Sequence, residues 1–433
     1  MDQETKVLLI HVANTAKKGP RINLIPMGTF FIADFLKNKG IKTQIIHENL
    51  EKQLDNNFSI IKHIKKFNPT ICCISINWHQ QSTSTIKKIL EIKESFPSLK
   101  IVTGGFTASY FAEKLLREFP SIDYVIRGDA ETPLYKLAKN TDPKTIPNLI
   151  WRNNKKKVIT NKKTYQISNS ILRNASFTNF KLLKNYQTYF EMRMNTESEN
   201  NEGIFYFSAG RGCNGNCLYC AGGRLAQQKF NNRNSVFYYP IPFIISELKN
   251  LRKYKINTWN SCFDPNPYSD FYIKLFKEIR RNKIKLTHHF DCFGLPNKKF
   301  IDDFKATFSQ KSALNLSPET GSETLRKKIK SFYYTNTNLL ETITYIVKQK
   351  MNCSVYFSTN QPFETLADQK KTQQLLKEIQ KISPKIEIYN QKIDLEPGSI
   401  HFENQTKLFT NSFFSSNFSP KVTNSSSLKV SKA

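Results

Sequence analysis

Three cysteines in one short loop could hold an iron–sulfur cluster. Cys213, Cys217 and Cys220 stand in the stretch GRGCNGNCLYCAGG, residues 210–223. Three thiolates can bind three irons of a four-iron, four-sulfur cluster, which leaves the fourth iron free to bind another molecule. The loop could also be a zinc site that borrows a fourth ligand, or a set of unrelated buried cysteines. Zinc sites usually contain two C-x2-C pairs, and the chain has no second pair, so we favour the cluster.

The residues between the cysteines suit a bulky inorganic group. Arg211 and the loop amides could offset the negative charge of a thiolate-bound cluster. Glycines leave room for the backbone to wrap closely around it, and they stand at positions 210, 212, 215, 222 and 223. We therefore expect the loop to enclose a 4Fe-4S cluster.

The loop resembles the signature of the radical S-adenosylmethionine (SAM) superfamily, which is C-x3-C-x2-C with an aromatic residue before the last cysteine, here Tyr219. The resemblance implies that the open iron binds the methionine amine and carboxylate of SAM. It also implies that one electron cleaves SAM to a 5′-deoxyadenosyl radical, so a reductant such as flavodoxin or ferredoxin is an expected partner. The protein then supplies binding, orientation and the exclusion of side reactions.

Length and composition favour a two-domain protein without a membrane segment. The chain has 433 residues, of which 39% are hydrophobic, enough for two packed domains. No apolar run approaches the roughly 20 residues that span a bilayer, and the N-terminus lacks a signal-peptide pattern. We therefore expect a cytoplasmic protein with reduced thiols and no disulfide framework. The other five cysteines fall in apolar runs and are expected in the core: Cys72, Cys73, Cys262, Cys292 and Cys353.

The charge of the chain raises the question of an anionic partner. Its 65 basic and 35 acidic residues give a formal net charge of +30. A nucleic-acid surface should concentrate that charge on one face, whereas the lysines are scattered, with one dense group at 155–157, 162 and 163. We therefore expect no nucleic-acid partner. The alternative from another class is a non-catalytic, zinc-stabilised protein that uses its charge to hold nucleic acid.

The first 150 residues alternate short apolar strands with helices. Strands are predicted at 7–11, 43–47, 70–76, 101–103 and 124–126, and helices at 28–37, 59–66, 82–95 and 109–118. Strands that are apolar throughout and separated by helices indicate a doubly wound parallel sheet covered on both faces. Ligands of such sheets bind beyond the carboxyl ends of the strands. The candidate binding residues there are Ser75, Gly104, Gly105, Gly128 and Glu131.

This region resembles the cobalamin-binding domain that precedes many radical SAM domains, in the Thr-Gly-Gly strand end from Thr103 and the run YVIRGDAE from Tyr124. The resemblance implies a cobalamin-binding-like domain at residues 1–150 and cobalamin as a further cofactor. The D-x-H-x-x-G motif, whose histidine binds cobalt in many such proteins, is absent after the first strand, so histidine ligation is not expected. His79 is the one histidine expected near a ligand, or else a hydrogen-bonded loop residue. A domain that has lost cobalamin, with the two glycines only making a tight turn, is the alternative.

The second half of the chain predicts a partial (β/α)6 barrel. Residues 151–202 are polar and indicate a linker, residues 203–400 contain six repeats of strand then helix, and residues 401–433 are expected to form a poorly ordered tail. Active sites of barrels gather at the carboxyl ends of the strands. The cysteine loop follows the first strand, and Asp264 and Asp291 stand at the ends of the second and third.

The fourth strand end carries the candidate SAM ligands. Its run SPETGSE, residues 317–323, resembles the superfamily segment that contacts the ribose and methionine of SAM. The resemblance implies that Ser317 and Glu319 bind SAM, and Tyr219 is a further candidate cofactor-binding residue. The alternative is a helix N-terminus that is capped by Ser322. The turn after the fifth strand lacks both glycines of the family's G-x-P-G-E-T pattern, which leaves the adenine contacts open.

The predicted function is therefore radical SAM chemistry, and the resemblance implies cobalamin-dependent methylation of an unactivated carbon. The substrate is expected to be a small molecule or a peptide. Cyclisation or rearrangement without methyl transfer uses the same machinery and is the alternative outcome. The sequence identifies no general acid or base.

Overall fold

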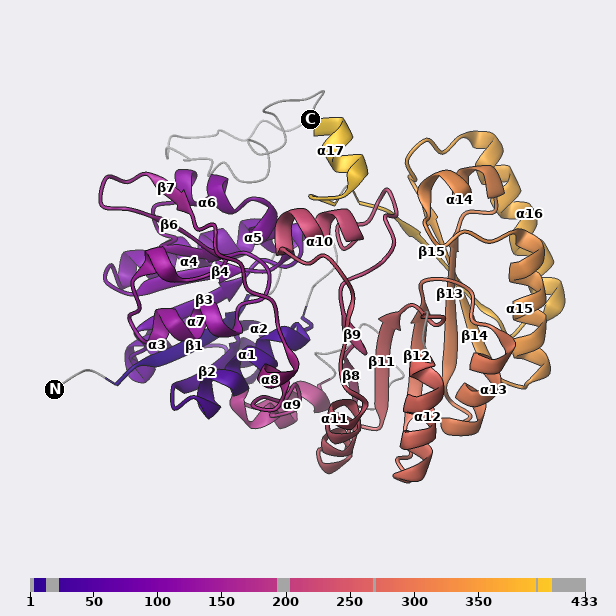
Figure 1. Ribbon diagram of the computed structural model, residues 1–433, viewed down its shortest axis with the longest axis horizontal. Helices are drawn as coiled ribbons and strands as arrows, with labels where there is room; N and C mark the ends of the chain where they lie inside the picture. Colours follow the sequence, from indigo (N-terminus) through magenta and orange to yellow (C-terminus); the bar gives the residue numbers. More distant parts are fainter. Residues whose placement is uncertain (1–3, 13–22, 193–202, 268–269, 395, 407–433) are drawn as a thin grey trace, which may run out of the picture.

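Two sheets, one from each half of the chain, form the body of the protein (Figure 1). The structure is a computed structural model and describes residues 4–12, 23–192, 203–267, 270–394 and 396–406. None of the described helices is long and apolar enough to cross a membrane.

The N-terminal sheet has the strand order β2-β1-β3-β4-β5-β6-β7, and its first five strands run parallel, as predicted. The strand order reverses between β1 and β3, which is where doubly wound sheets bind their ligands. The strands are β1 (Lys6–His11), β2 (Lys42–His47), β3 (Ile71–Ser75), β4 (Lys100–Gly104), β5 (Tyr124–Ile126), β6 (Leu149–Arg152) and β7 (Val158–Thr160).

Strands β6 and β7 lie mostly in the segment that the sequence predicts to be a linker. They pair antiparallel and extend the sheet beyond β5. Three members of the dense lysine group, Lys155 to Lys157, stand in the hairpin turn, where the amides of Lys155 and Lys157 each donate to Asn153 Oδ1 at 3.0 Å. Two strands this short beside a lysine-rich turn carry too little periodicity to be predicted. The end of the expected linker, residues 193–202, lies outside the described residues.

Helices cover both faces of this sheet, which explains why its strands are apolar throughout. Val7 and Leu9 of β1 pack with α1 and α7, whereas Leu8 and Ile10 pack with α3, α4 and α6, because successive strand residues point to opposite faces. The helices of this half are α1 (Met27–Asn38), α2 (Glu48–Leu54), α3 (Ile60–Phe67), α4 (Ser82–Ser95), α5 (Phe106–Tyr110), α6 (Ala112–Glu118), α7 (Glu131–Ala138), α8 (Asn169–Leu172) and α9 (Tyr186–Glu191).

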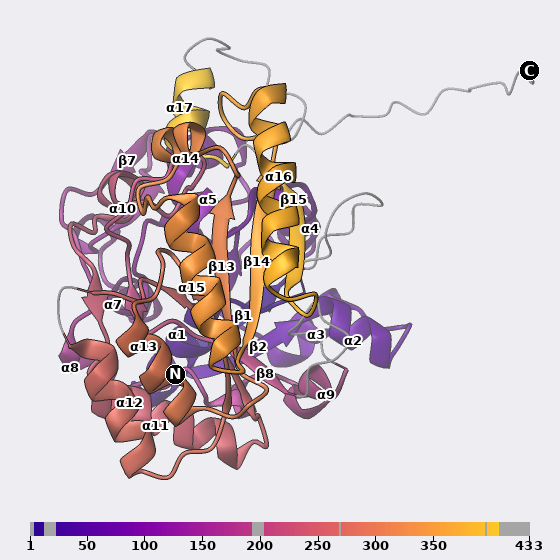
Figure 2. The ribbon, with the colours of Figure 1, turned by 90° about the vertical axis from the view of Figure 1, so that its right-hand side faces the viewer.

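The second half forms a parallel half-barrel of six strands, with the order β15-β14-β13-β12-β11-β8, labelled in Figure 1 and seen from its outer side in Figure 2. The predicted fold class is therefore confirmed. The strands are β8 (Ile204–Tyr206), β11 (Thr258–Phe263), β12 (Thr287–Cys292), β13 (Ala313–Glu319), β14 (Asn352–Thr359) and β15 (Glu387–Lys392), and a short ladder joins β9 (Gly210–Arg211) to β10 (Phe237–Tyr238). The helices are α10 (Arg224–Asn231), α11 (Ile241–Lys253), α12 (Phe271–Arg281), α13 (Lys298–Thr307), α14 (Glu323–Ile329), α15 (Asn336–Lys348), α16 (Leu366–Ile382) and α17 (Ile400–Thr406).

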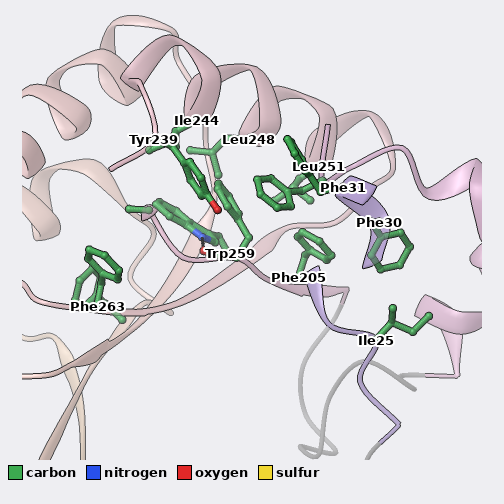
Figure 3. Close-up of a cluster of buried hydrophobic side chains, with 14 of the residues drawn as sticks. Ile25, Phe30, Phe31, Phe205, Tyr239, Ile244, Leu248, Leu251, Trp259 and Phe263 are labelled. Atoms are coloured by element: carbon green, nitrogen blue, oxygen red, sulfur yellow. Dashed lines mark hydrogen bonds between the residues drawn. The ribbon is translucent and has the colours of Figure 1, made fainter. Parts of the chain in front are cut away.

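One aromatic core runs through both halves of the chain (Figure 3). Phe30 of α1 packs edge-on against Phe205 of β8, with ring centroids 6.0 Å apart. The ring centroid of Phe31, also of α1, lies 6.4 Å from that of Phe243 of α11. Since aromatic side chains bury large apolar areas, these contacts pack α1 into the core of both halves of the chain.

The C-terminal segment packs back onto the N-terminal half. Helix α17 buries Phe402 against Tyr110 and Phe111, with ring centroids 5.6 and 6.4 Å away. The tail that the sequence predicts from residue 401 therefore begins as a packed helix, because the Phe402 side chain finds an aromatic site in the other domain. The remainder of that tail, residues 407–433, lies outside the described residues.

Buried ion pairs also join the two halves. Arg211 lies 2.8 Å from both Asp129 and Glu131 of the N-terminal half. Asp129 pairs with Arg233 as well. Burial favours the neutral form of Asp129, but the two arginines hold its pKa below the ordinary value. The expectation that Arg211 offsets the charge of a cluster is wrong, because its guanidinium is turned toward these carboxylates.

We expect Arg211→Gln to lower the free energy of unfolding by about 3–5 kcal/mol, because Glu131 loses its cation and Asp129 loses one of two. Urea unfolding of the full chain measures this change. Arg117→Gln is the matched control, since Arg117 meets Glu113 at 3.7 Å on the surface and should contribute at most about 1 kcal/mol. Equal losses of unfolding free energy in both variants would contradict the larger contribution that we expect from the interdomain ion pairs.

Candidate functional site

The cysteine loop lies between β9 and α10, and all three of its sulfurs accept hydrogen bonds from the backbone. Such donors favour the charged thiolate, which is the form that binds iron. The donors lie 3.3 to 3.5 Å from the sulfurs: Gly215 N from Cys213 Sγ, Gly222 N from Cys220 Sγ, and Ser331 N from Cys217 Sγ.

A four-iron cluster and a single metal ion place different demands on the spacing of their ligands. Within the part of the chain that the structure describes, no three His, Cys, Asp or Glu side chains are grouped as one ion requires. A four-iron cluster binds each cysteine through a different iron, so its ligands stand farther apart. Burial raises the pKa of Cys220 to about 12 and also raises that of Cys213, so metal binding must displace the thiol protons.

The glycines of the loop mostly permit close packing within the protein. A Cβ on Gly215 would lie 2.6 Å from the Phe332 ring. Gly212 has a φ of +95°, which other residues rarely adopt, and lies against Arg233. The interpretation that glycines make room for an inorganic group is therefore wrong for these two positions, where the protein itself fills the space.

Glu319 is brought to the cysteine loop by an irregularity at the end of β13. The register between β13 and β14 shifts between Leu316 and Glu319, and Glu319 has a φ of +66°, a strained backbone for a residue with a side chain. Its buried carboxylate accepts hydrogen bonds from Tyr219 OH at 3.1 Å and from Ser358 Oγ. Lys330 Nζ lies 3.6 Å away. Irregularities of this kind re-aim side chains beside functional sites.

The segment 317–323 has two interpretations, a set of SAM ligands or a capped helix N-terminus, and these apply to different residues. Ser322 caps α14, since its Oγ accepts from Leu325 N at 3.4 Å, as predicted. Glu319 belongs to the strand and faces the cysteine loop, and Ser317 precedes it by two residues on β13. Burial raises the pKa of Tyr219 well above its ordinary value, so this hydroxyl is a donor to Glu319.

A cavity of about 600 Å³ lies between the two halves of the chain. Cys213 and Cys220 of the cysteine loop line it from one side. The predicted strand-end residues of the N-terminal sheet all line it from the other: Ser75, Gly104, Gly105, Gly128 and Glu131. The structure thus brings the two predicted cofactor regions to one space.

The strand-end residues also have structural roles of their own. Gly105 has a φ of +100°, and a Cβ there would lie 2.6 Å from Asn77 Oδ1, so the glycine pair makes the tight turn as well as a wall of the cavity. Glu131 Oε1 accepts from Arg211, whereas Glu131 Oε2 is buried without a hydrogen-bond partner among the described residues. A buried, unpaired carboxylate oxygen beside a cavity is suited to a ligand that donates a hydrogen bond.

Two of the cysteines expected in the core face this cavity instead. Cys72, Cys292 and Cys353 are buried as predicted, but Cys262 and Cys73 line the cavity. Cys262 is open to the cavity while protein surrounds it, and burial raises its pKa well above the ordinary value. An apolar strand pattern cannot reveal that a thiol faces a cavity. Whether a neighbouring side chain covers the thiol depends on the tertiary structure.

The histidines near the cavity differ from those predicted. His79 Nδ1 lies 3.3 Å from Glu396 Oε2 of the C-terminal segment, which agrees with the interpretation of His79 as a hydrogen-bonded loop residue. His11 lines the cavity, with its ring 4.9 Å from that of His47. Sequence reasoning missed His11, although its position at the carboxyl end of β1 was a usable signal.

The two aspartates at the barrel strand ends are held by local partners. Asp264 Oδ1 accepts from Asn266 N at 3.0 Å, which is the predicted turn. Asp291 accepts from Asn315 Nδ2 at 2.6 Å, and burial raises its pKa. Neither geometry identifies an acid or base for catalysis.

Two protein families match the two halves of the chain. Residues 21–138 match the B12 binding domain, and residues 207–376 match the radical SAM superfamily. The hopanoid C-3 methylase of Methylococcus capsulatus is 23% identical over 133 residues, which are 30% of this chain. The chain spans 25% of the length of that methylase.

Two solved structures of the radical SAM methyltransferase TsrM from Kitasatospora setae share the fold. TsrM with tryptophan substrate and the SAM analogue aza-SAM has a TM-score of 0.72 at 14% identity, covering 93% of this chain and 76% of TsrM. TsrM with cobalamin and a 4Fe-4S cluster has a TM-score of 0.72 at 14% identity, covering 94% and 78%. The likeness extends over both sheets and shows a common architecture.

The two family matches fall on the two halves that line the cavity. Together they imply three cofactors, a 4Fe-4S cluster, SAM and cobalamin, and they favour an enzyme over a zinc-stabilised nucleic-acid-binding protein. The chain therefore belongs to the radical SAM superfamily, as an enzyme with an N-terminal B12 binding domain.

Proposed function

We propose that this enzyme is a cobalamin-dependent methyltransferase that acts on an unactivated carbon of a small molecule or peptide. The observation that carries the proposal is the shared cavity. The strand ends of the B12 binding domain and two cluster cysteines line the same space of about 600 Å³. A substrate in this cavity would meet a methyl donor on one side and a source of radicals on the other.

The residues present fit the implied cofactors. When bound, the cluster and SAM supply the 5′-deoxyadenosyl radical, and cobalamin supplies the methyl group. Cys213, Cys217 and Cys220 would hold the cluster through sulfurs that backbone amides already face. Glu131 Oε2, buried and unpaired among the described residues, could accept a hydrogen bond from an amide group of cobalamin.

The wall opposite the B12 binding domain suits a radical reaction. Phe263 and Phe293 line the cavity beside Cys262, and their apolar surfaces would keep water from the reacting carbon. Ser317 and Glu319 would bind SAM, with Glu319 oriented by its contacts to Tyr219, Ser358 and Lys330. These contacts position the carboxylate beside the cysteine loop.

The products of SAM test the proposal. Replacing C–H by C–CH3 uses one SAM as methyl donor, which leaves S-adenosylhomocysteine, and a second as radical source, which leaves 5′-deoxyadenosine and methionine. After anaerobic reconstitution with iron, sulfide and hydroxocobalamin, and with dithionite as reductant, we expect both products by liquid chromatography. 5′-Deoxyadenosine without S-adenosylhomocysteine would favour cyclisation or rearrangement, and S-adenosylhomocysteine alone would exclude the radical step.

Cysteine variants test the cluster ligands. We expect Cys217→Ala to lose the brown colour of the reconstituted protein and to release no 5′-deoxyadenosine, because the cluster loses one of three thiolate ligands. Iron content and absorbance in the visible range measure the cluster. Cys262→Ala is the matched control, since this thiol lines the same cavity but stands outside the loop. A Cys217→Ala protein that still cleaves SAM would refute the assignment.

Glu319→Gln tests the SAM site without removing a cluster ligand. We expect the KM for SAM to rise roughly tenfold to a hundredfold, because a charge-assisted hydrogen bond contributes about 1.5–3 kcal/mol. The iron content should stay unchanged. Asp264→Asn is the comparison, since its carboxylate serves a local turn. An unchanged KM for Glu319→Gln would assign Glu319 to structure alone.

A further inference from the structure

The two faces of the half-barrel differ in chemistry. Successive side chains of a strand point to opposite faces. Those on the outer face of β12 and β14 are apolar and pack against the helices that lie along this side in Figure 1: Phe290, Cys292, Val355 and Phe357. The side chains on the inner face are polar: Asn260, His289, Asp291, Asn315, Ser354 and Tyr356. The inner face therefore suits a ligand with hydrogen-bonding groups better than an apolar one.

One row of the inner face leads from the cavity into the half-barrel. The register pairs Cys262 of β11 with Asp291 of β12, and Asp291 with Asn315 of β13. Cys262 lines the cavity between the two halves, and neighbouring strands lie about 5 Å apart. Burial raises the pKa of the Cys262 thiol, and the negative charge of Asp291 raises it further. A ligand held at Asp291 would thus reach the cavity past Cys262.

Asp291 is a half-buried carboxylate without a cation beside it. Its Oδ1 accepts a hydrogen bond from Asn315 Nδ2 at 2.6 Å. Within the described ranges of the chain, no Lys, Arg or His nitrogen lies within 4.0 Å of its oxygens, although the sequence contains 65 lysines and arginines. Burial raises its pKa, which is the cost of holding an uncompensated charge inside the protein. A positively charged group of a ligand would offset that cost.

The basic side chains at this end of the half-barrel do not supply that charge. His289 stands two residues before Asp291 on the same face, and burial lowers its pKa, so its imidazole is neutral in the physiological range. Lys330 Nζ lies 3.6 Å from Glu319 Oε1, and only 4% of its side chain is exposed. The charge of Asp291 is therefore left for a ligand.

An aromatic ring and an amide oxygen complete the surroundings of Asp291. Burial raises the pKa of the Tyr356 hydroxyl, and the charge of Asp291 adds to this effect, so Tyr356 lies near the carboxylate. Its ring stacks on that of Tyr389, with centroids 4.7 Å apart. Asn260 is 8% exposed, its Oδ1 has no hydrogen-bond partner among the described residues, and it points to the same face as Cys262. A protonated amine suits this set, since it donates hydrogen bonds to carboxylate and amide oxygens and is attracted by aromatic rings.

We propose that the substrate is a polar molecule with a protonated amine, which Asp291 binds on the inner face of the half-barrel. The proposal rests on the proposed function, because it names the class of molecule that would be methylated. With its amine at Asp291, the substrate extends past Cys262 into the cavity, where the methyl donor and the source of radicals would meet. An uncharged lipid has no group to compensate Asp291 and falls outside this class.

The binding of two matched probes tests the substrate class without turnover. Phenethylamine is a cation at neutral pH, and phenethyl alcohol is its uncharged counterpart of nearly the same shape. SAM itself carries an amine, so the reconstituted enzyme is first saturated with S-adenosylhomocysteine to fill the SAM site. We expect the amine to bind roughly tenfold more tightly than the alcohol in titration calorimetry, because a hydrogen bond between charged groups is stronger than one to a neutral hydroxyl.

A variant of the same shape links this preference to Asp291. We expect Asp291→Asn to bind phenethylamine roughly tenfold more weakly and to bind phenethyl alcohol as the unmodified enzyme does. Asp264→Asn is the matched control, because it removes a carboxylate just after the neighbouring strand, where Asp264 accepts from Asn266 N in a local turn. This control should keep the preference for the amine. Equal affinities of the two probes for the unmodified enzyme, a preference retained by Asp291→Asn, or the same loss in both variants would overturn the proposal.

The affinity for SAM distinguishes a substrate site from a cofactor site. Asp291→Asn should keep the iron content of the unmodified enzyme and its dissociation constant for SAM. Weaker binding of SAM together with an unchanged preference for the amine would assign Asp291 to the cofactor, and the proposal would fail. The absence of 5′-deoxyadenosine and S-adenosylhomocysteine would instead refute the proposed function, while a preference for the amine that depends on Asp291 would still support the amine site.

Discussion

The ion pairs of Arg211 hold together the two halves of the site. Arg211 stands two residues before Cys213, and its guanidinium contacts Asp129 and Glu131, which follow the fifth strand of the other domain. The position of the cysteine loop is therefore set by the B12 binding domain as well as by the half-barrel. Buried charges are costly to desolvate, so an arrangement that leaves them unpaired is strongly disfavoured.

Apolar contacts in the shared aromatic core also fix the position of one half of the chain against the other. Phe30 and Phe31 of α1 pack against β8 and α11, so the first helix of one domain belongs to the core of the other. Helix α17 makes the reciprocal contact: it follows the half-barrel in sequence, and its Phe402 packs against Tyr110 of the N-terminal half. These contacts make the cavity a fixed feature of one packed body, because neither sheet can move without exposing apolar surface.

Sequence reasoning was reliable where the pattern was local and long enough. The parallel strands, the cap at Ser322 and the turn at Asp264 follow from short-range periodicity and turn chemistry. It failed at β6 and β7, where two short strands and a lysine-rich turn resemble a linker. It also assigned Arg211 to the cluster, because nearness in sequence does not show that two buried carboxylates lie nearer in space.

The sequence by itself determined the prediction of cluster chemistry at the cysteine loop, since the three candidate ligands and their aromatic neighbour lie within one short segment and need no distant residue to be recognised. Only the tertiary structure decided what faces that loop. Cys262 and His11 belong to strands whose patterns indicate burial, yet both line the cavity. Which strand end is covered depends on how two sheets from distant parts of the chain pack together, and no local pattern encodes that packing.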